Sequence, residues 1–144
     1  MAALGPVMLK QIIFTEPLWR QMCTVAEENL PEEACGLLSG IDQHVHEVIP
    51  ILNILHSSVR YRMDPRQQLR VFQQIEENGL ELIGIFHSHP TGPDHPSETD
   101  IAEAYYPESA SVILYPDENK WAARAFLIDP PAVNEIPLII TTGI

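Results

Sequence analysis

The sequence predicts an α/β domain in which helices flank a mixed or antiparallel β-sheet. Apolar residues make up 45% of the 144-residue chain, which is enough for one compact core. Short apolar runs with strand patterning alternate with segments of helical periodicity. The sequence contains no repeat, linker or low-complexity stretch. We therefore expect a single domain over residues 1–144, with a flexible end at residues 1–7.

The first half of the chain predicts strands interrupted by one helix. An apolar run at residues 9–14 predicts a short strand. Thr15 can cap a helix over residues 16–29, which Pro31 ends. Three strands with apolar or period-two patterning should follow, at residues 34–40, 45–53 and 58–63.

The second half begins with a helix and continues into the most polar loop of the chain. Asp64 and Pro65 predict the helix start, and Asn78-Gly79 predicts its end. Its expected apolar face consists of Leu69, Val71, Phe72 and Ile75. Residues 80–87 are apolar enough for a central strand, and prolines make residues 89–97 a stiff loop. Three further strands are expected at residues 111–115, 121–128 and 135–141.

Charge, apolar runs and cysteine content limit the kinds of binding partner and the cellular compartment that we expect. The 20 acidic and 8 basic residues give a formal charge of -12, which does not favour nucleic acid. Residues 1–14 lack a signal-peptide pattern, and no stretch reaches the ~18 apolar residues of a membrane span. Cys23 and Cys35 could form one disulfide at most, which a chain of this length does not need. We expect a cytoplasmic protein that binds neither nucleic acid nor membranes.

A candidate metal site follows the central strand. His87 and His89 are two positions apart, so on extended backbone both imidazoles lie on one face and can bind one metal ion. Asp100 adds a carboxylate in the first turn of a helix that Ser97 is expected to cap. Two histidines and one carboxylate leave a tetrahedral zinc with an open position for water, as in catalytic sites. A pair of surface histidines in a polar loop is the alternative.

Two other residues are candidates for catalysis. An activated water needs a proton acceptor, commonly a carboxylate. Glu33 directly precedes the buried strand and can project towards the metal, whereas Glu32 should point to the opposite face. The alternative for Glu33 is an ordinary solvated strand terminus. Ser97 can cap its helix and could also donate a hydrogen bond to an oxyanion, with capping alone as the alternative.

Two rival functions use the same residues differently. Cys35 with His87 or His89 as its base would suit a cysteine protease, but an apolar strand favours a buried, unreactive thiol. A non-catalytic binding module with structural zinc would need a fourth protein ligand, for which His95 is the candidate. The free acid Glu33 favours catalysis over such a module.

The remaining histidines are His44, His46 and His56, which we expect to be surface or strand residues. His44 and His46 repeat the spacing of the first pair, but no acid-bearing helix follows them. We therefore expect no metal site there.

The candidate residues resemble the signature of the JAMM, or MPN-plus, metallopeptidase family. That signature is a distant Glu, then His-x-His-Pro, a short loop and Ser-x-x-Asp. Here it consists of Glu33, His87-Ser88-His89-Pro90 and Ser97-Glu98-Thr99-Asp100. The segments PEEACGLLSG, YRMDP and IGIFHSHP are similar to small prokaryotic stand-alone members, so the resemblance covers nearly the whole chain. No signature position is missing, unlike in the inactive MPN relatives.

The resemblance implies a fold, a metal and an activity. The fold is a curved mixed β-sheet flanked by helices, the JAMM/MPN or cytidine deaminase-like fold of the α/β (α+β) class. One Zn²⁺ per chain is implied on His87, His89 and Asp100, with Glu33 as general acid/base and Ser97 stabilising the oxyanion. The implied partner is the C-terminal tail of a ubiquitin-like or sulfur-carrier protein, cleaved after Gly-Gly at a peptide or isopeptide bond, in one type with release of cysteine. A non-catalytic MPN-type scaffold is the alternative, and an oligomer is compatible with either.

Overall fold

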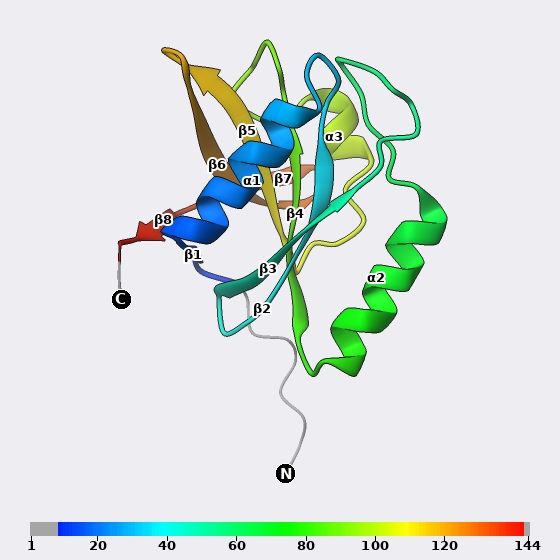
Figure 1. The fold of residues 1–144 in the computed structure, drawn as a ribbon, viewed down its shortest axis with the longest axis vertical. Helices are drawn as coiled ribbons and strands as arrows, with labels where there is room; N and C mark the ends of the chain where they lie inside the picture. The colour runs from blue at the N-terminus through cyan, green and yellow to red at the C-terminus, as the bar shows by residue number, and fades with distance from the viewer. Residues whose placement is uncertain (1–8, 143–144) are drawn as a thin grey trace.

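The computed structural model describes residues 9–142, which form an eight-stranded sheet flanked by three helices (Figure 1). The helices are α1 (Glu16–Glu28), α2 (Pro65–Glu77) and α3 (Glu98–Ala102). The strands are β1 (Ile12–Thr15), β2 (Cys35–Ile41), β3 (His44–Ile51), β4 (Glu81–Ser88), β5 (Ala110–Asp117), β6 (Lys120–Asp129), β7 (Ala132–Ile136) and β8 (Leu138–Thr141). The flexible end expected at residues 1–7 lies outside the described residues, and one domain over residues 1–144 stays a prediction.

The sheet is mixed and curved, as expected (Figure 1). Its strand order is β7-β6-β5-β4-β2-β3-β1-β8, so β4 lies near the middle. β4 runs parallel to β5, and β1 runs parallel to β3 and β8, whereas the other neighbouring pairs are antiparallel. The apolar segment predicted to be central, residues 80–87, therefore occupies a central strand.

The helices cover opposite faces of the sheet, because successive strand residues point to opposite sides. On β2, Leu38 belongs to the apolar cluster that contains Met22 of α1, whereas Leu37 belongs to the cluster that contains Val71 of α2. Ile113 of β5 lies outside the α1 cluster and packs with α3. The short helix α3 is thus held against the face that also carries α2.

The ends of α1 and α2 lie close to where the sequence signals predicted them, but two details of these helices differ from expectation. The Asp64 side chain accepts hydrogen bonds from two backbone N–H groups at the start of α2, and Gly79 follows its C-cap with a φ of +70°. Thr15 is the N-cap of α1, but its side chain makes no capping bond. Leu69 of α2 is 59% exposed, so it does not belong to the buried face. Within the described residues, no helix is long and apolar enough to cross a membrane.

The strand predicted at residues 58–63 does not form. This segment is a loop, attached to the rest of the chain by an isolated bridge between Asn53 and Met63. The buried side chain of Asn53 bonds to backbone groups around the loop, namely those of Glu33, Leu55, Arg60 and Arg62. One amide side chain therefore satisfies backbone groups that a sheet would otherwise pair.

The strand predicted at residues 135–141 is two strands. β7 and β8 are separated by Pro137 and lie at opposite edges of the sheet. Proline has no N–H to donate to a neighbouring strand, so the chain can leave one edge there and continue to the other.

Candidate metal centre and active site

The site lies where β4 ends. In the sheet register His87 is opposite Cys35 on β2 and Ile113 on β5. One step past the strand, the His89 N–H donates to the Leu114 carbonyl over 2.8 Å. Both histidines are therefore held on extended backbone in the middle of the sheet, with their side chains on one face as the spacing predicted.

Three potential ligand atoms converge at this point. The two Nε2 atoms of His87 and His89 are 3.0 Å apart, and each lies 3.1 Å from Oδ2 of Asp100. The two histidines are only 3% and 4% exposed. The structure thus brings together the three residues that the sequence suggested as metal ligands.

The spacing of these atoms fits a zinc ion. Ligand atoms about 2.0–2.1 Å from a tetrahedral zinc are about 3.3 Å from one another, close to the sides of the triangle formed by His87, His89 and Asp100. Two imidazole nitrogens and a carboxylate oxygen are also a donor set that zinc accepts. The residues therefore suit the metal that the family resemblance implies.

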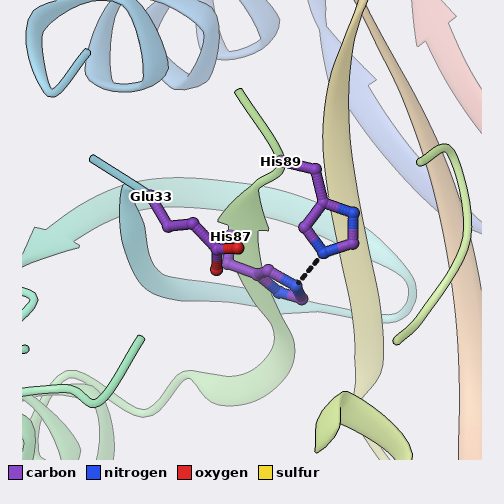
Figure 2. Close-up of side chains that lie close together, drawn as sticks. All are labelled: Glu33, His87 and His89. Atoms are coloured by element: carbon purple, nitrogen blue, oxygen red, sulfur yellow. Dashed lines mark hydrogen bonds between the residues drawn. The ribbon is translucent and has the colours of Figure 1, made fainter. Parts of the chain in front are cut away.

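Glu33 lies beside the triangle. One of its carboxylate oxygens and one ring nitrogen from each of His87 and His89 lie within 4.8 Å of one another. Figure 2 shows the Glu33 side chain reaching from the start of β2 towards the two imidazole rings. Glu33 is 3% exposed, and its buried Oε1 has no hydrogen-bond partner. A buried acid without a partner at this place is available to a metal, a water or a substrate.

Burial makes Glu33 a much weaker acid than usual. Loss of water raises its pKa to about 7, against a smaller lowering by His89, and Asp100 adds to the increase. A carboxyl group with a pKa near neutrality can both accept and return a proton, as a general acid/base must. Glu32, in contrast, is partly exposed and its carboxylate lies 3.1 Å from Nδ1 of His56, as expected for the residue facing away.

The two histidines and Asp100 also differ in their acid–base properties. Burial lowers the pKa of His87 despite its contact with Asp100. Burial lowers the pKa of His89 as well, but hydrogen bonds with Asp100 and the Pro93 carbonyl outweigh it, so the pKa is raised. Burial would raise the pKa of Asp100, yet bonds from both histidines hold it well below its usual range. Asp100 is therefore ionised at neutral pH beside the two ring nitrogens.

A capping box places Asp100 in the site. The Ser97 hydroxyl accepts a hydrogen bond from the Asp100 N–H over 3.0 Å, and the Asp100 carboxylate accepts one from the Ser97 N–H over 2.9 Å. The accepting oxygen, Oδ2, is the one that faces the histidines. Because the Ser97 oxygen acts as acceptor in the cap, its hydroxyl hydrogen is left for another partner.

The sequence did not single out three residues that support the site. Ser88, between the two histidines, accepts a hydrogen bond from the Ala34 N–H over 2.8 Å and so ties the Glu33 segment to β4. Asn53 donates to the Glu33 carbonyl over 3.0 Å. Tyr61 stacks on the His87 ring at 4.6 Å. Two sequence signals bore on these roles: Ser88 lies inside the His-x-His motif, and Tyr61 begins the segment YRMDP that is similar to family members.

A cavity of about 330 Å³ adjoins the triangle between α2 and α3. His87 and Asp100 form part of its wall. Much of the remaining wall is aromatic or aliphatic, including Tyr61, Met63, Ile85 and Tyr106. The site therefore combines a polar centre with an apolar space large enough for part of a peptide.

Cys35 does not suit the role of nucleophile, and His95 does not suit the role of fourth metal ligand. Cys35 is buried, burial raises the pKa of its thiol to about 12, and Sγ donates to the Ile51 carbonyl over 3.3 Å. Such a thiol is unreactive at neutral pH. His95 is exposed and its ring pairs with the neighbouring Asp94. Neither Cys23 nor Cys35 forms a disulfide.

Comparison with known proteins identifies related sequences. Residues 15–128 match the family described as prokaryotic homologs of the JAB domain. The CysO-cysteine peptidase of Mycobacterium tuberculosis is 30% identical over 130 residues, which cover 88% of this chain and 89% of that protein. The probable TtuB-protein conjugate cleaving protease of Thermus thermophilus is 38% identical over 111 residues, covering 76% and 70%. The residues that match the family, 15–128, span all the signature positions.

Similar structures agree with this match. The solution structure of the protein DSY2949 from Desulfitobacterium hafniense has a TM-score of 0.83 at 34% identity and covers 92% of this chain and 94% of that one. The JAB1/MPN domain protein AF2198 from Archaeoglobus fulgidus has a TM-score of 0.55 at 21% identity, covering 89% and 99%, which supports the fold alone. The expected JAMM/MPN fold is therefore confirmed.

Proposed function

The chain belongs to the prokaryotic homologs of the JAB domain, and from this membership we propose that it is a zinc-dependent peptidase of ubiquitin-like or sulfur-carrier proteins. The bond cleaved is the peptide or isopeptide bond that follows the C-terminal Gly-Gly of such a protein. The observation that carries the proposal is the buried triangle of His87, His89 and Asp100 with the unpartnered acid Glu33 beside it.

One zinc ion per chain would be held by Nε2 of His87, Nε2 of His89 and Oδ2 of Asp100. When bound, zinc supplies a Lewis acid that polarises a carbonyl group and lowers the pKa of water to near neutrality. Three protein ligands leave a coordination position free for this chemistry. His95, the candidate fourth ligand, is turned away towards Asp94, which supports an open site rather than a closed structural one.

Glu33 moves the proton in the reaction. Its carboxylate accepts a proton from the attacking water and returns it to the departing amine, so that the residue ends in its starting state. Three features support this role: Oε1 has no other partner, the pKa is near 7, and the backbone is fixed by Asn53. The same features would be unfavourable in a carboxylate that served only the fold.

Ser97 donates its free hydroxyl hydrogen towards the carbonyl oxygen as negative charge develops there. Support comes from the capping box, in which the Ser97 oxygen is an acceptor and leaves the hydrogen available. Capping also fixes the orientation of this side chain beside Asp100, so the donor is pre-positioned.

An extended tail suits the shape of the site. The cavity between α2 and α3 reaches His87 and Asp100, and the tail or the residue released from it would lie there against apolar walls. The names of the two relatives support substrates in which a protein carries an added group: CysO-cysteine for one, and TtuB-protein conjugates for the other. A carrier extended by cysteine and a carrier conjugated to a second protein are the two substrates to compare.

The test uses purified, metal-quantified protein and a panel of ubiquitin-like sulfur carriers extended past Gly-Gly. Glu33→Gln should retain zinc and lower turnover by about 10²- to 10⁴-fold, the usual contribution of general acid–base catalysis. Glu32→Gln is the matched control, because this neighbour faces His56 and solvent, and its turnover should stay within about twofold of wild type. Cleavage by wild type and Glu32→Gln only would support the proposal. Full activity of Glu33→Gln would show that Glu33 is not the general acid/base. Bound zinc with no cleavage of any carrier would favour a non-catalytic MPN-type module.

A further inference from the structure

Arg124 joins the loop after β4 to the far strands of the sheet. Its side chain extends from β6, where Nη1 donates to Oδ2 of Asp94 over 2.8 Å. On the other side Nε and Nη2 donate to the two carboxylate oxygens of Glu135 on β7, over 2.9 and 2.8 Å. The guanidinium also lies 5.4 Å from the Phe126 ring. It is therefore fixed by β6 and β7 and in turn fixes one residue of the loop.

That loop residue is next to a contact of the proposed metal ligand His89. The carbonyl of Pro93, the residue before Asp94, lies 2.7 Å from Nδ1 of His89. A carbonyl can only accept, so Nδ1 carries a hydrogen, and Nε2, which lies towards His87 and Asp100, is the ring nitrogen left for the proposed metal. The orientation and the tautomer of His89 thus depend on where the Pro93 carbonyl is held.

We infer that Arg124 is a positioning residue for the metal centre, acting through Asp94 and the Pro93 carbonyl on the imidazole of His89. The inference rests on the proposed zinc site. Arg124 lies 30 residues from Asp94 in sequence, and its hydrogen bonds among the described residues go to Asp94 and Glu135 and not to the proposed ligands. Its contribution is to keep a proline-rich loop in the one position from which His89 is correctly bonded.

A purely stabilising role does not account for this arrangement. The side chains of Arg124 and Asp94 are 33% and 45% exposed, and ion pairs this open to water contribute little to folding stability. The positive charge of Arg124 would by itself weaken metal binding, because it repels a divalent cation. Loss of Arg124 should therefore tighten zinc binding if only charge matters, and weaken it if position matters.

The experiment measures zinc affinity by competition with a chromophoric chelator in wild type, Arg124→Gln, Arg124→Lys and Arg20→Gln. Visible absorption of the Co²⁺-substituted proteins reports ligand geometry, and thermal unfolding of the metal-free proteins reports stability. Arg124→Lys keeps the charge but loses the two-sided contact, and it decides the question if Arg124→Gln does not fold. Arg20→Gln removes a more exposed arginine, paired with Glu16 on α1, away from the site.

Both Arg124 variants should raise the zinc dissociation constant by about three- to tenfold, below the 10- to 100-fold typical of a partner bonded directly to a ligand. Their Co²⁺ spectra should change, while Arg20→Gln should match wild type in both measurements. Unchanged or tighter zinc binding by the Arg124 variants, with a wild-type Co²⁺ spectrum, would overturn the inference and leave the proposed function intact. If wild type itself did not bind zinc, both the inference about Arg124 and the proposed function would be overturned.

Discussion

The chain contains two His-x-His pairs with the same spacing. The first pair, His44 and His46, lies at the start of β3, and the second pair, His87 and His89, lies at or just past the end of β4. Both members of the first pair are exposed, and Nδ1 of His44 lies 2.9 Å from the nearby Asp42 carbonyl. Both members of the second pair are buried and lie 3.0 Å apart. Among the described residues, the second pair clusters with Glu33 closely enough to share a metal ion, and the first pair belongs to no such cluster.

The difference lies in what surrounds the histidines. β4 is a central strand, so its end is covered by neighbours on both sides, by the loop after it and by α3. Within residues 9–142, no capped helix supplies an acid to the first pair in the way that α3 supplies Asp100. The His-x-His spacing aligns two side chains, but burial and a third group from a distant segment are what distinguish a candidate metal site from a solvated pair.

The largest expected effect comes from removing either histidine of the buried pair. His87→Ala and His89→Ala should lose stoichiometric zinc and more than about 100-fold in activity, since losing a group one shell further out already costs about 10- to 100-fold. His44→Ala and His46→Ala should retain zinc and full activity. Metal analysis and turnover of the four purified variants check this. Equal zinc loss from both pairs would remove the distinction between them.

The next largest effect is expected on the pH dependence of stability, through Glu33, the acid beside the buried pair. The pKa of Glu33 is raised from 4.5 to about 7 in the folded protein, so between these values the unfolded chain ionises first and stability falls as pH rises. A difference of about 2.5 in pKa corresponds to up to about 3 kcal/mol. Metal-free Glu33→Gln should therefore be more stable than metal-free wild type at pH 8, by up to about 3 kcal/mol, and no more stable at pH 4.

Chemical denaturation of the two chelator-treated proteins at both pH values measures this difference. The variant with the lower activity would then be the more stable one, as expected where a functional group is buried without a partner. If Glu33→Gln were no more stable than wild type at pH 8, the ionised Glu33 carboxylate would not destabilise the folded protein.

A smaller effect is expected at the helix that brings Asp100 to the buried pair. Ser97→Ala removes the cap and should lower the free energy of unfolding by about 1 kcal/mol, whereas Ser97→Gly should cost only a few tenths of that unit. Both lack the hydroxyl donor, so both should lose at least about tenfold in kcat if that donor stabilises the oxyanion. Denaturation and steady-state kinetics separate the two roles. Normal kcat in Ser97→Gly would leave Ser97 with capping alone.

The smallest effect on activity is expected at Cys35, which faces His87 across the sheet. Its thiol is buried, and burial raises its pKa to about 12, so it takes no part in proton transfer at neutral pH. Cys35→Ala should keep turnover within about twofold and cost about 1 kcal/mol of stability from lost packing. Loss of turnover with zinc retained would revive the cysteine as a nucleophile.

Much of the fold follows from short-range patterns. Asp64 and Gly79 delimit α2, and the capping box at Ser97 and Asp100 begins α3, because these signals act within a few residues. The apolar run before His87 correctly indicated a central strand for the same kind of reason. The expected strand at residues 58–63 failed because Asn53, five or more residues away, binds its backbone instead.

For the candidate site, too, some features follow from the sequence and others from the tertiary structure. Sequence by itself determined which ligand types are present, that His87 and His89 share a face, and that Asp100 sits in the first turn of a helix. Only the tertiary structure decided that Glu33 is buried without a partner, that His89 bonds to the Pro93 carbonyl, and that Arg124 braces the loop. These features depend on loss of water and on contacts between segments far apart in the chain, such as Ala34 and Ser88, which are 54 residues apart. Spacing and periodicity carry no information about such contacts, so they become visible only when the sheet is assembled.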